Sequence, residues 1–246
     1  YRGFISVDEA IDAILGRSQD KISIPNEIIL ALIKREIDNH RGKALFIDGF
    51  PRTMDQVSYS LFFRDLVDYR EDPDVFISID IPEMVINERM KSRVVCPKCQ
   101  TPRNLKLFTT KEVGYDEEKN EFYLKCDNEG CEGARMIKKD GDDAGIESIR
   151  DRLDADQKII DKTFSLHGIP RIFLRNAVPV DRADELVDKY EITPEYYYEL
   201  DKKNKKVNIL EKPWSIKDDE GVEVNSLLAP PVVLSLVKQL SKALGL

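Results

Sequence analysis

Apolar residues recur at helical spacing in the first part of the chain. Residues 7–15 and residues 27–40 both carry apolar side chains three and four positions apart, and each stretch ends near a glycine. This pattern predicts two amphipathic helices. The second helix leads into the apolar run of residues 43–48, which we interpret as a short buried strand.

A second strand and helix follow in the same order. Residues 74–80 form a short apolar run between Pro73 and Pro82, and residues 81–93 return to a helical pattern. Helices that alternate with buried strands favour a parallel sheet joined by right-handed crossovers. We therefore expect an α/β fold whose functional edge lies at the carboxyl ends of the strands.

The pattern changes in the second half of the chain. Residues 94–141 combine charged turns with alternating segments and predict a small β-rich insertion, after which residues 146–164 read as a helix. We expect residues 165–192 to form a further insertion with its own short strand and helix, and residues 205–214 to form another strand. The last 17 residues predict a core-packed helix with these apolar positions: Val233, Leu236, Val237, Leu240 and Leu244.

Charge and hydropathy narrow the classes of function. The 246 residues have a net charge of −8, and 34% of them are charged, so a nucleic-acid partner held by phosphate neutralisation is disfavoured. No apolar run approaches the length of a membrane span, and no signal-peptide pattern opens the chain. We expect a soluble cytoplasmic protein without a membrane partner.

Four cysteines lie close together in the sequence. They form two pairs, Cys96 with Cys99 and Cys126 with Cys131, all inside the predicted β-rich insertion. Two close pairs in a reducing compartment favour a tetrahedral thiolate site for structural Zn²⁺. The alternative is a metal-free loop.

The first predicted strand ends in residues that suit a phosphate site. Asp48 at the carboxyl end of a buried parallel strand can hold a metal-bound water. Gly49 allows close approach of the backbone to a ligand, and Pro51 fixes the turn. Arg52 can present a planar fork to phosphate oxygens.

These residues carry a resemblance to a known family. The stretch Asp48-Gly49-Phe50-Pro51-Arg52, with Gln56 four positions later, resembles the signature of adenylate kinases. Residues 23–27 are similar to that family's segment before the following helix, and residues 88–93 resemble the helix that enters its mobile lid. The four-cysteine insertion resembles the zinc-bearing lid of many bacterial members.

The resemblance implies a fold and a division into parts. It implies a P-loop kinase-like parallel sheet with helices on both faces, a small AMP-binding part and a β-rich zinc lid. We expect residues 1–24 to belong to the AMP-binding subdomain, 25–93 to the core, 94–141 to the lid and 142–246 to the core, with the insertion at about 165–192.

The resemblance also implies an activity. The expected reaction is reversible phosphoryl transfer from ATP to AMP, giving two ADP, by a monomer that uses Mg²⁺ with ATP and holds Zn²⁺ in its lid. Such a phosphotransferase works by positioning two anionic nucleotides and by stabilising charge on the moving phosphoryl group. Clustered guanidinium groups suit that chemistry.

Individual residues receive roles by the same resemblance. In the catalytic group, Asp48 would organise metal-bound water, and phosphates would be held by Arg52, Arg93 and Arg152. Gln56 would read the AMP base and Arg89 would cover the ATP base, with Arg89 and Arg93 on one helical face. The full set of expected substrate contacts is Ser23, Ile24, Gly49, Gln56 and Arg89.

The sequence departs from the family in two places. No glycine-rich GxxxxGK[ST] loop is present, so we expect the chain to be part of a longer kinase whose first strand and phosphate loop precede Tyr1. Lys138 and Lys139 stand where the family has an arginine before Asp142 and Asp143. The alternatives are a kinase that prefers another base, a degenerate inactive relative, or a non-catalytic nucleotide-binding or zinc-ribbon protein.

Overall fold

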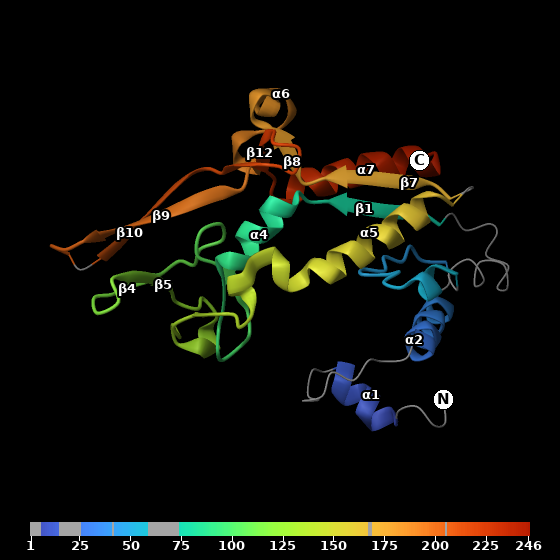
Figure 1. Cartoon of the computed structure of the whole chain (residues 1–246), viewed down its shortest axis with the longest axis horizontal. Helices are drawn as coiled ribbons and strands as arrows, with labels where there is room; N and C mark the ends of the chain where they lie inside the picture. The colour runs from blue at the N-terminus through green and yellow to red at the C-terminus, as the bar shows by residue number, and fades with distance from the viewer. Residues whose placement is uncertain (1–5, 15–25, 41, 59–73, 167–168, 205) are drawn as a thin grey trace. The chain divides into compact units, whose positions relative to one another are not determined.

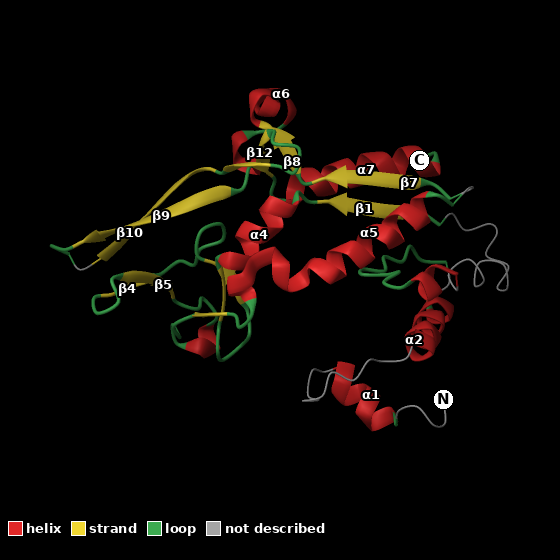
Figure 2. Cartoon of the chain, in the orientation of Figure 1, coloured by secondary structure: helices red, strands yellow, loops and turns green. Residues whose placement is uncertain are grey.

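The computed structural model describes six stretches of the chain, coloured in Figure 1: residues 6–14, 26–40, 42–58, 74–166, 169–204 and 206–246. Helices and strands are mixed along it (Figure 2). Contacts divide the chain into two units, which we describe in turn: residues 1–74 with 153–168, and residues 75–152 with 169–246.

Helices are the regular secondary structure of the first unit in its described residues. Helix α1 (Val7–Ile14) and helix α2 (Asn26–Asn39) confirm the two amphipathic helices that the spacing predicts. A capping box opens α1, because the Glu9 N–H donates to Ser6 Oγ and the Ser6 N–H donates to Glu9 Oε2. The unit also contains a helical turn over residues 54–58 and most of helix α5 (Arg150–Phe164).

The strand expected over residues 43–48 is not formed. These residues have no strand assignment, and Leu45, Phe46 and Ile47 are 43%, 72% and 45% exposed. A strand in a parallel sheet needs neighbours that pair its backbone groups and cover its apolar side chains. None of the described segments pairs with this one.

The second unit contains a parallel pair of strands. β1 (Phe76–Asp80) pairs with β7 (Arg171–Arg175), and Phe76 lies opposite Arg171 at the start of the register. This pair confirms the parallel α/β arrangement and the predicted strand near residues 74–80. β7 lies within residues 165–192, for which the sequence predicts a short strand and helix of their own.

Helix α7 (Ala229–Leu244) covers one face of this pair (Figure 1). Its Val232 joins Ile172 and Leu174 in a buried cluster, and Leu236 and Leu240 pack against them. The predicted final helix is therefore confirmed, but the face that packs on the sheet is rotated about the helix axis relative to the predicted one. Val233 and Val237, expected in the core, are 52% and 56% exposed.

Further strands extend the second unit beyond the parallel pair. A three-stranded antiparallel sheet has the order β11-β12-β8, and β9 and β10 form a long antiparallel hairpin. β10 confirms the strand expected near residues 205–214. The bounds are β8 (Ala177–Pro179), η4 (Val180–Arg182), α6 (Ala183–Leu186), η5 (Lys189–Glu191), β9 (Pro194–Asp201), β10 (Lys206–Pro213), β11 (Ser215–Lys217) and β12 (Glu223–Ser226).

The cysteine-rich segment is rich in short strands, as predicted. We call residues 93–141 the cysteine module. It contains a sheet of order β3-β2-β6 and a hairpin of β4 with β5. The bounds are β2 (Arg93–Val95), β3 (Pro102–Asn104), β4 (Val113–Asp116), β5 (Glu121–Leu124), η2 (Glu129–Cys131) and β6 (Ile137–Lys138).

The β9–β10 hairpin is fastened to the cysteine module. Tyr198 packs against the buried core of the module, and its hydroxyl donates to the Leu105 carbonyl oxygen. The Tyr198 ring lies 5.6 Å from that of Phe122 between centroids. The Tyr196 N–H donates to the Lys106 carbonyl oxygen at 2.7 Å. Ring packing and backbone hydrogen bonding therefore hold the same two segments together.

Helix α4 (Glu83–Lys91) is shorter than the sequence predicts. It ends with Ser92 as its C-cap, and Arg93 begins β2. Arg89 and Arg93 therefore do not share a helical face, which corrects that expectation. None of the described helices combines the length and apolar character needed to cross a membrane.

Gly145 sets the packing of α4 against the segment η3 (Asp142–Ile149). Its φ is +57°, and a Cβ at this position would lie 2.2 Å from Asn87 Oδ1. Asn87 is buried and accepts a hydrogen bond from the Ile146 N–H at 3.1 Å. An added methyl group would therefore collide with a buried and hydrogen-bonded side chain.

The Gly145→Ala substitution should be more destabilising than Gly141→Ala. Both glycines have a positive φ, but no atom lies within 4 Å of a Cβ added at Gly141. The overpacking at Gly145 should lower the free energy of unfolding by about 2 kcal/mol more than the control does. Urea denaturation of both variants measures the difference, and equal losses would contradict the packing argument.

Candidate active site and metal centre

Residues 48–56 form a compact loop in the first unit. Gly49 has a φ of +68°, and a Cβ there would approach Arg52 Nη2 to 2.6 Å. Arg52 Nε donates a hydrogen bond to the Gly49 carbonyl oxygen at 2.8 Å. Glycine is therefore needed both for the backbone conformation and for the close approach of the guanidinium group.

Gln56 stabilises this loop from inside. Its side chain is only 3% exposed, and its Oε1 accepts the Arg52 backbone N–H at 2.6 Å. Its own N–H donates to Thr53 Oγ1 at 3.2 Å. The Arg52 residue is exposed. The loop thus combines an exposed cation with a buried amide.

Asp48 lies at the start of the loop and is exposed. With Ile33 of α2 and Phe46 it lines a groove of about 410 Å³ in the first unit. A carboxylate and a guanidinium in one short loop can bind a hydrated cation and an anion side by side. The structure brings Asp48, Gly49, Arg52 and Gln56 together, whereas Ser23 and Ile24 lie outside the described residues.

Arg93 lies in the second unit and is paired with a buried carboxylate. Its Nε and Nη2 donate to the two oxygens of Asp142 at 2.5 and 2.6 Å. The hydrogen bonds that Arg93 donates to Asp142, whose side chain is 8% exposed, raise the pKa of the Arg93 guanidinium. An anionic ligand of Arg93 would have to share this cation with Asp142 or displace it.

Arg89 has neutral partners. It lies in the last turn of α4, and its Nη2 donates to Asn176 Oδ1 at 3.2 Å and to Ser226 Oγ at 3.0 Å. Burial lowers the pKa of its guanidinium. Sequence reasoning missed Asn176 and Ser226, because their contact with Arg89 spans 87 and 137 positions and follows no local motif.

Arg152 lies on the exposed surface of α5, next to the carboxylate pairs of Arg150. Arg150 donates to Glu83 at 2.7 Å and to Glu147 at 3.1 Å. The hydrogen bond with Glu83 raises the pKa of Arg150. Arg150 therefore holds α5 to α4, and Arg152 is an exposed residue at the same end of α5.

The four cysteine sulfurs converge at one point of the cysteine module. All lie within 4.8 Å of one another, and the pairs Cys96–Cys131 and Cys99–Cys126 are 3.7 Å apart. A disulfide would require about 2.05 Å. A tetrahedral ion with sulfur ligands at about 2.3 Å would give edges of about 3.8 Å, which the observed pairs match. The four thiols can bind a metal ion.

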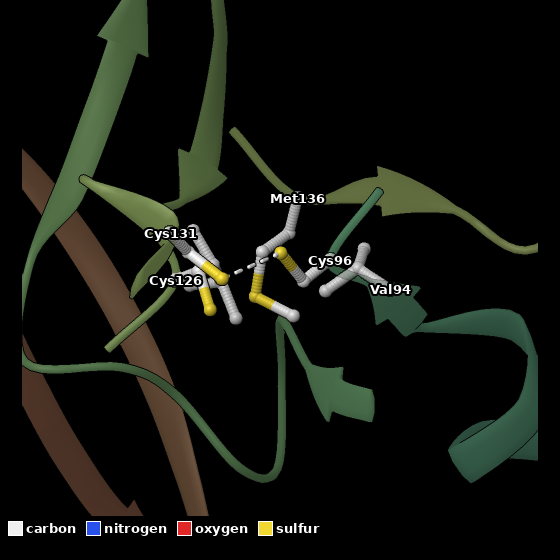
Figure 3. Packing of buried hydrophobic residues seen from close by; sticks show 6 residues of the cluster. Val94, Cys96, Cys126, Cys131 and Met136 are labelled. Atoms are coloured by element: carbon white, nitrogen blue, oxygen red, sulfur yellow. Dashed lines mark hydrogen bonds between the residues drawn. The ribbon is translucent and has the colours of Figure 1, made fainter. Parts of the chain in front are cut away.

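The core around the sulfurs is small. Figure 3 shows the Cys96, Cys126 and Cys131 side chains meeting beside Val94 and Met136. Three of the four cysteines are buried, and Cys99 is the exposed one. Its hydrogen bonds with Thr101 lower the pKa of the Cys99 thiol to about 5, whereas the neighbouring Cys99 sulfur and burial raise that of Cys131 to about 12. A bound cation would favour the thiolate form of all four cysteines.

Comparison with known proteins gives one consistent result. No family model matches the chain. An adenylate kinase of Clostridium beijerinckii is 31% identical over 146 residues, which are 59% of this chain and 60% of the relative. An adenylate kinase of Syntrophomonas wolfei is 31% identical over 132 residues, which are 53% of this chain and 54% of the relative. This chain resembles adenylate kinases.

A third adenylate kinase, from Mesoplasma florum, is 28% identical over 132 residues, or 54% of each chain. The chain thus spans about half the length of the curated relatives it matches. The resemblance to adenylate kinases is confirmed by these matches, and the parallel pair of β1 and β7 agrees with the α/β fold that this resemblance implies.

Replacing Cys131 by serine should abolish metal binding. A neutral hydroxyl does not replace a thiolate ligand, and the remaining three sulfurs leave the site incomplete. Metal analysis of the purified protein measures the loss. Met136→Leu is the control, because it keeps the volume of the same buried core and all four thiols. A Cys131→Ser protein that keeps its metal would show that the sulfurs do not form the site.

Proposed function

We propose that this chain is part of an adenylate kinase, which transfers a phosphoryl group reversibly from ATP to AMP and yields two ADP. The observation that carries the proposal is the similarity to several curated adenylate kinases, 26–31% identical over about half of the chain. The loop of residues 48–56 and the four converging thiols are the structural features that support it.

The proposed roles follow from the family resemblance, and the charge and exposure of Arg52 support its part. Arg52 is exposed and anchored only by Gly49 among the contacts given above, so its Nη groups can meet a phosphate of the acceptor nucleotide. Asp48 would hold water bound to the Mg²⁺ that accompanies ATP, and this ion would supply charge neutralisation on the phosphates. Gln56 and the backbone near Ser23 and Ile24 are proposed to contact the AMP base.

In the second unit, Arg89 is proposed to cover the donor base, and Arg93 and Arg152 to hold transferring phosphates. These guanidinium groups would act by stabilising charge that develops during transfer. The cysteine module is proposed to be a lid that holds Zn²⁺ and excludes water while the phosphoryl group moves. Cysteines kept reduced for a metal support the proposal of a cytoplasmic location.

The direct test is an assay of the full-length protein for phosphoryl transfer from ATP to AMP, with GMP, CMP and UMP as alternative acceptors. Formation of ADP with AMP as the preferred acceptor is the expected result. Preference for GMP, CMP or UMP would show that the acceptor base is not adenine. Absence of transfer with every acceptor would contradict the proposal.

The Arg52→Ala substitution in the full-length protein should lower turnover by about 100- to 1000-fold. The thermal midpoint should stay nearly unchanged, because the Arg52 side chain is exposed and makes one hydrogen bond to the backbone of the described residues, to the Gly49 carbonyl oxygen. Arg182→Ala, which removes an arginine that is 59% exposed, is the control. A large loss of stability with normal turnover would instead make Arg52 structural.

Removal of the metal should loosen the cysteine module more than the sheet. A chelator should speed hydrogen exchange in residues 93–141 and leave β1 and β7 almost unchanged, since the small core of the module depends on the thiolate site. Mass spectrometry measures the exchange. Adding Zn²⁺ should return the exchange of these residues to its slow rate, whereas adding Mg²⁺ should not. Faster exchange spread evenly over the chain, or none at all, would argue against this dependence.

A further inference from the structure

Arg89 is held in a partly buried polar pocket built from three separate segments. It comes from the end of α4, Asn176 directly follows β7, and Ser226 ends β12. One guanidinium nitrogen, Nη2, makes both hydrogen bonds, to Asn176 Oδ1 and to Ser226 Oγ. The pocket lies where β1 and β7 reach their carboxyl ends, the edge at which α/β sheets bind ligands.

The two partners of Arg89 are themselves fixed. Ser226 is fully buried and its hydroxyl donates to Asn176 Oδ1 at 3.2 Å. Asn176 is 8% exposed, and its Nδ2 donates to the Leu227 carbonyl oxygen at 3.1 Å. Its backbone N–H donates to the Asp80 carbonyl oxygen at 2.8 Å. Arg89 therefore rests on a rigid support that pre-orients the plane of its guanidinium group.

The charge of Arg89 is left without a carboxylate partner among the described residues. By contrast, Arg93 of β2 and Arg150 of α5 each pair with one or more carboxylates. Placing a cation among neutral oxygens is costly, and a purely structural arginine at this depth would gain from an acidic partner. The arrangement instead keeps the charge and the flat face of the guanidinium group for an electron-rich ligand.

We infer that Asn176 and Ser226 are positioning residues that orient Arg89 toward the base of the donor nucleotide. This inference rests on the proposed function, in which Arg89 covers the base of ATP. Among the described residues, the hydrogen bonds of the two side chains reach Arg89, the Leu227 carbonyl oxygen and each other. Their effect on nucleotide binding is therefore expected to pass through Arg89.

The test is the dissociation constant for ATP, measured by calorimetry on the full-length protein, together with KM for ATP, KM for AMP and kcat. Ser226→Ala removes the hydroxyl from a fully buried position without adding volume. It should weaken ATP binding by about tenfold, the loss expected for one hydrogen bond to a charged group. KM for AMP and kcat should stay within about twofold of the wild type.

Asn176→Asp is the second variant, and it changes the charge beside Arg89 without changing the size of the supporting side chain. It keeps the size of the side chain but places a carboxylate beside Arg89, so the guanidinium charge is compensated inside the protein. ATP binding should weaken while the thermal midpoint is kept or rises. If Asn176 had only a structural role, the thermal midpoint would likewise be kept or rise, but ATP binding would be unchanged.

Ser215→Ala is the matched control, since Ser215 belongs to the same three-stranded sheet but is exposed and bonds Glu223. Unchanged ATP affinity in Ser226→Ala and Asn176→Asp, or equal losses for ATP and AMP, would overturn the inference. If the wild type binds ATP but transfers no phosphoryl group, the proposed function fails while the calorimetry still decides the inference. If the wild type binds no ATP, both fail.

Discussion

The meeting of four cysteine sulfurs is the interaction on which the cysteine module depends. The cysteine module has short strands and a small apolar core around Val94, Leu124 and Met136. A core of this size contributes little stability by burial alone, so an ion that cross-links four chain positions would dominate its folding energy. The β9–β10 hairpin packs on the same core through Tyr198, and its position depends on the module being folded.

Local patterns were sufficient where neighbours in sequence are also neighbours in space. The spacing of apolar residues predicted α1, α2, β1 and the final helix, and the two cysteine pairs predicted a common metal site. Predictions failed where contacts with segments distant in sequence determine whether a strand forms or which helix face is buried. Residues 43–48 have strand-forming side chains but no described partner, and α7 turns a different face inward because β7 lies beneath Val232 rather than Val233.

The candidate site shows the same limit. Asp48, Gly49, Arg52 and Gln56 could be found from one short stretch, because the loop is built from its own hydrogen bonds. The partners of the other arginines could not, since Arg93 meets Asp142 and Arg89 meets Ser226 only after the chain has folded. Sequence reasoning therefore found the cations and missed the groups that hold or neutralise them.

The β9–β10 hairpin connects two parts of the second unit that differ in architecture. At one end Trp214 follows β10 and is buried with Val85 and Leu107, and further along Tyr198 sits on the cysteine module. A shift of one residue in the register of an antiparallel pair moves every side chain to the opposite face, so β9 and β10 resist sliding along one another. Leu107 of the module packs on Trp214 at the base of the hairpin, and Tyr198 packs on the module core further along. Because the module is held at two points along a hairpin of fixed register, we expect the hairpin and the module to move together.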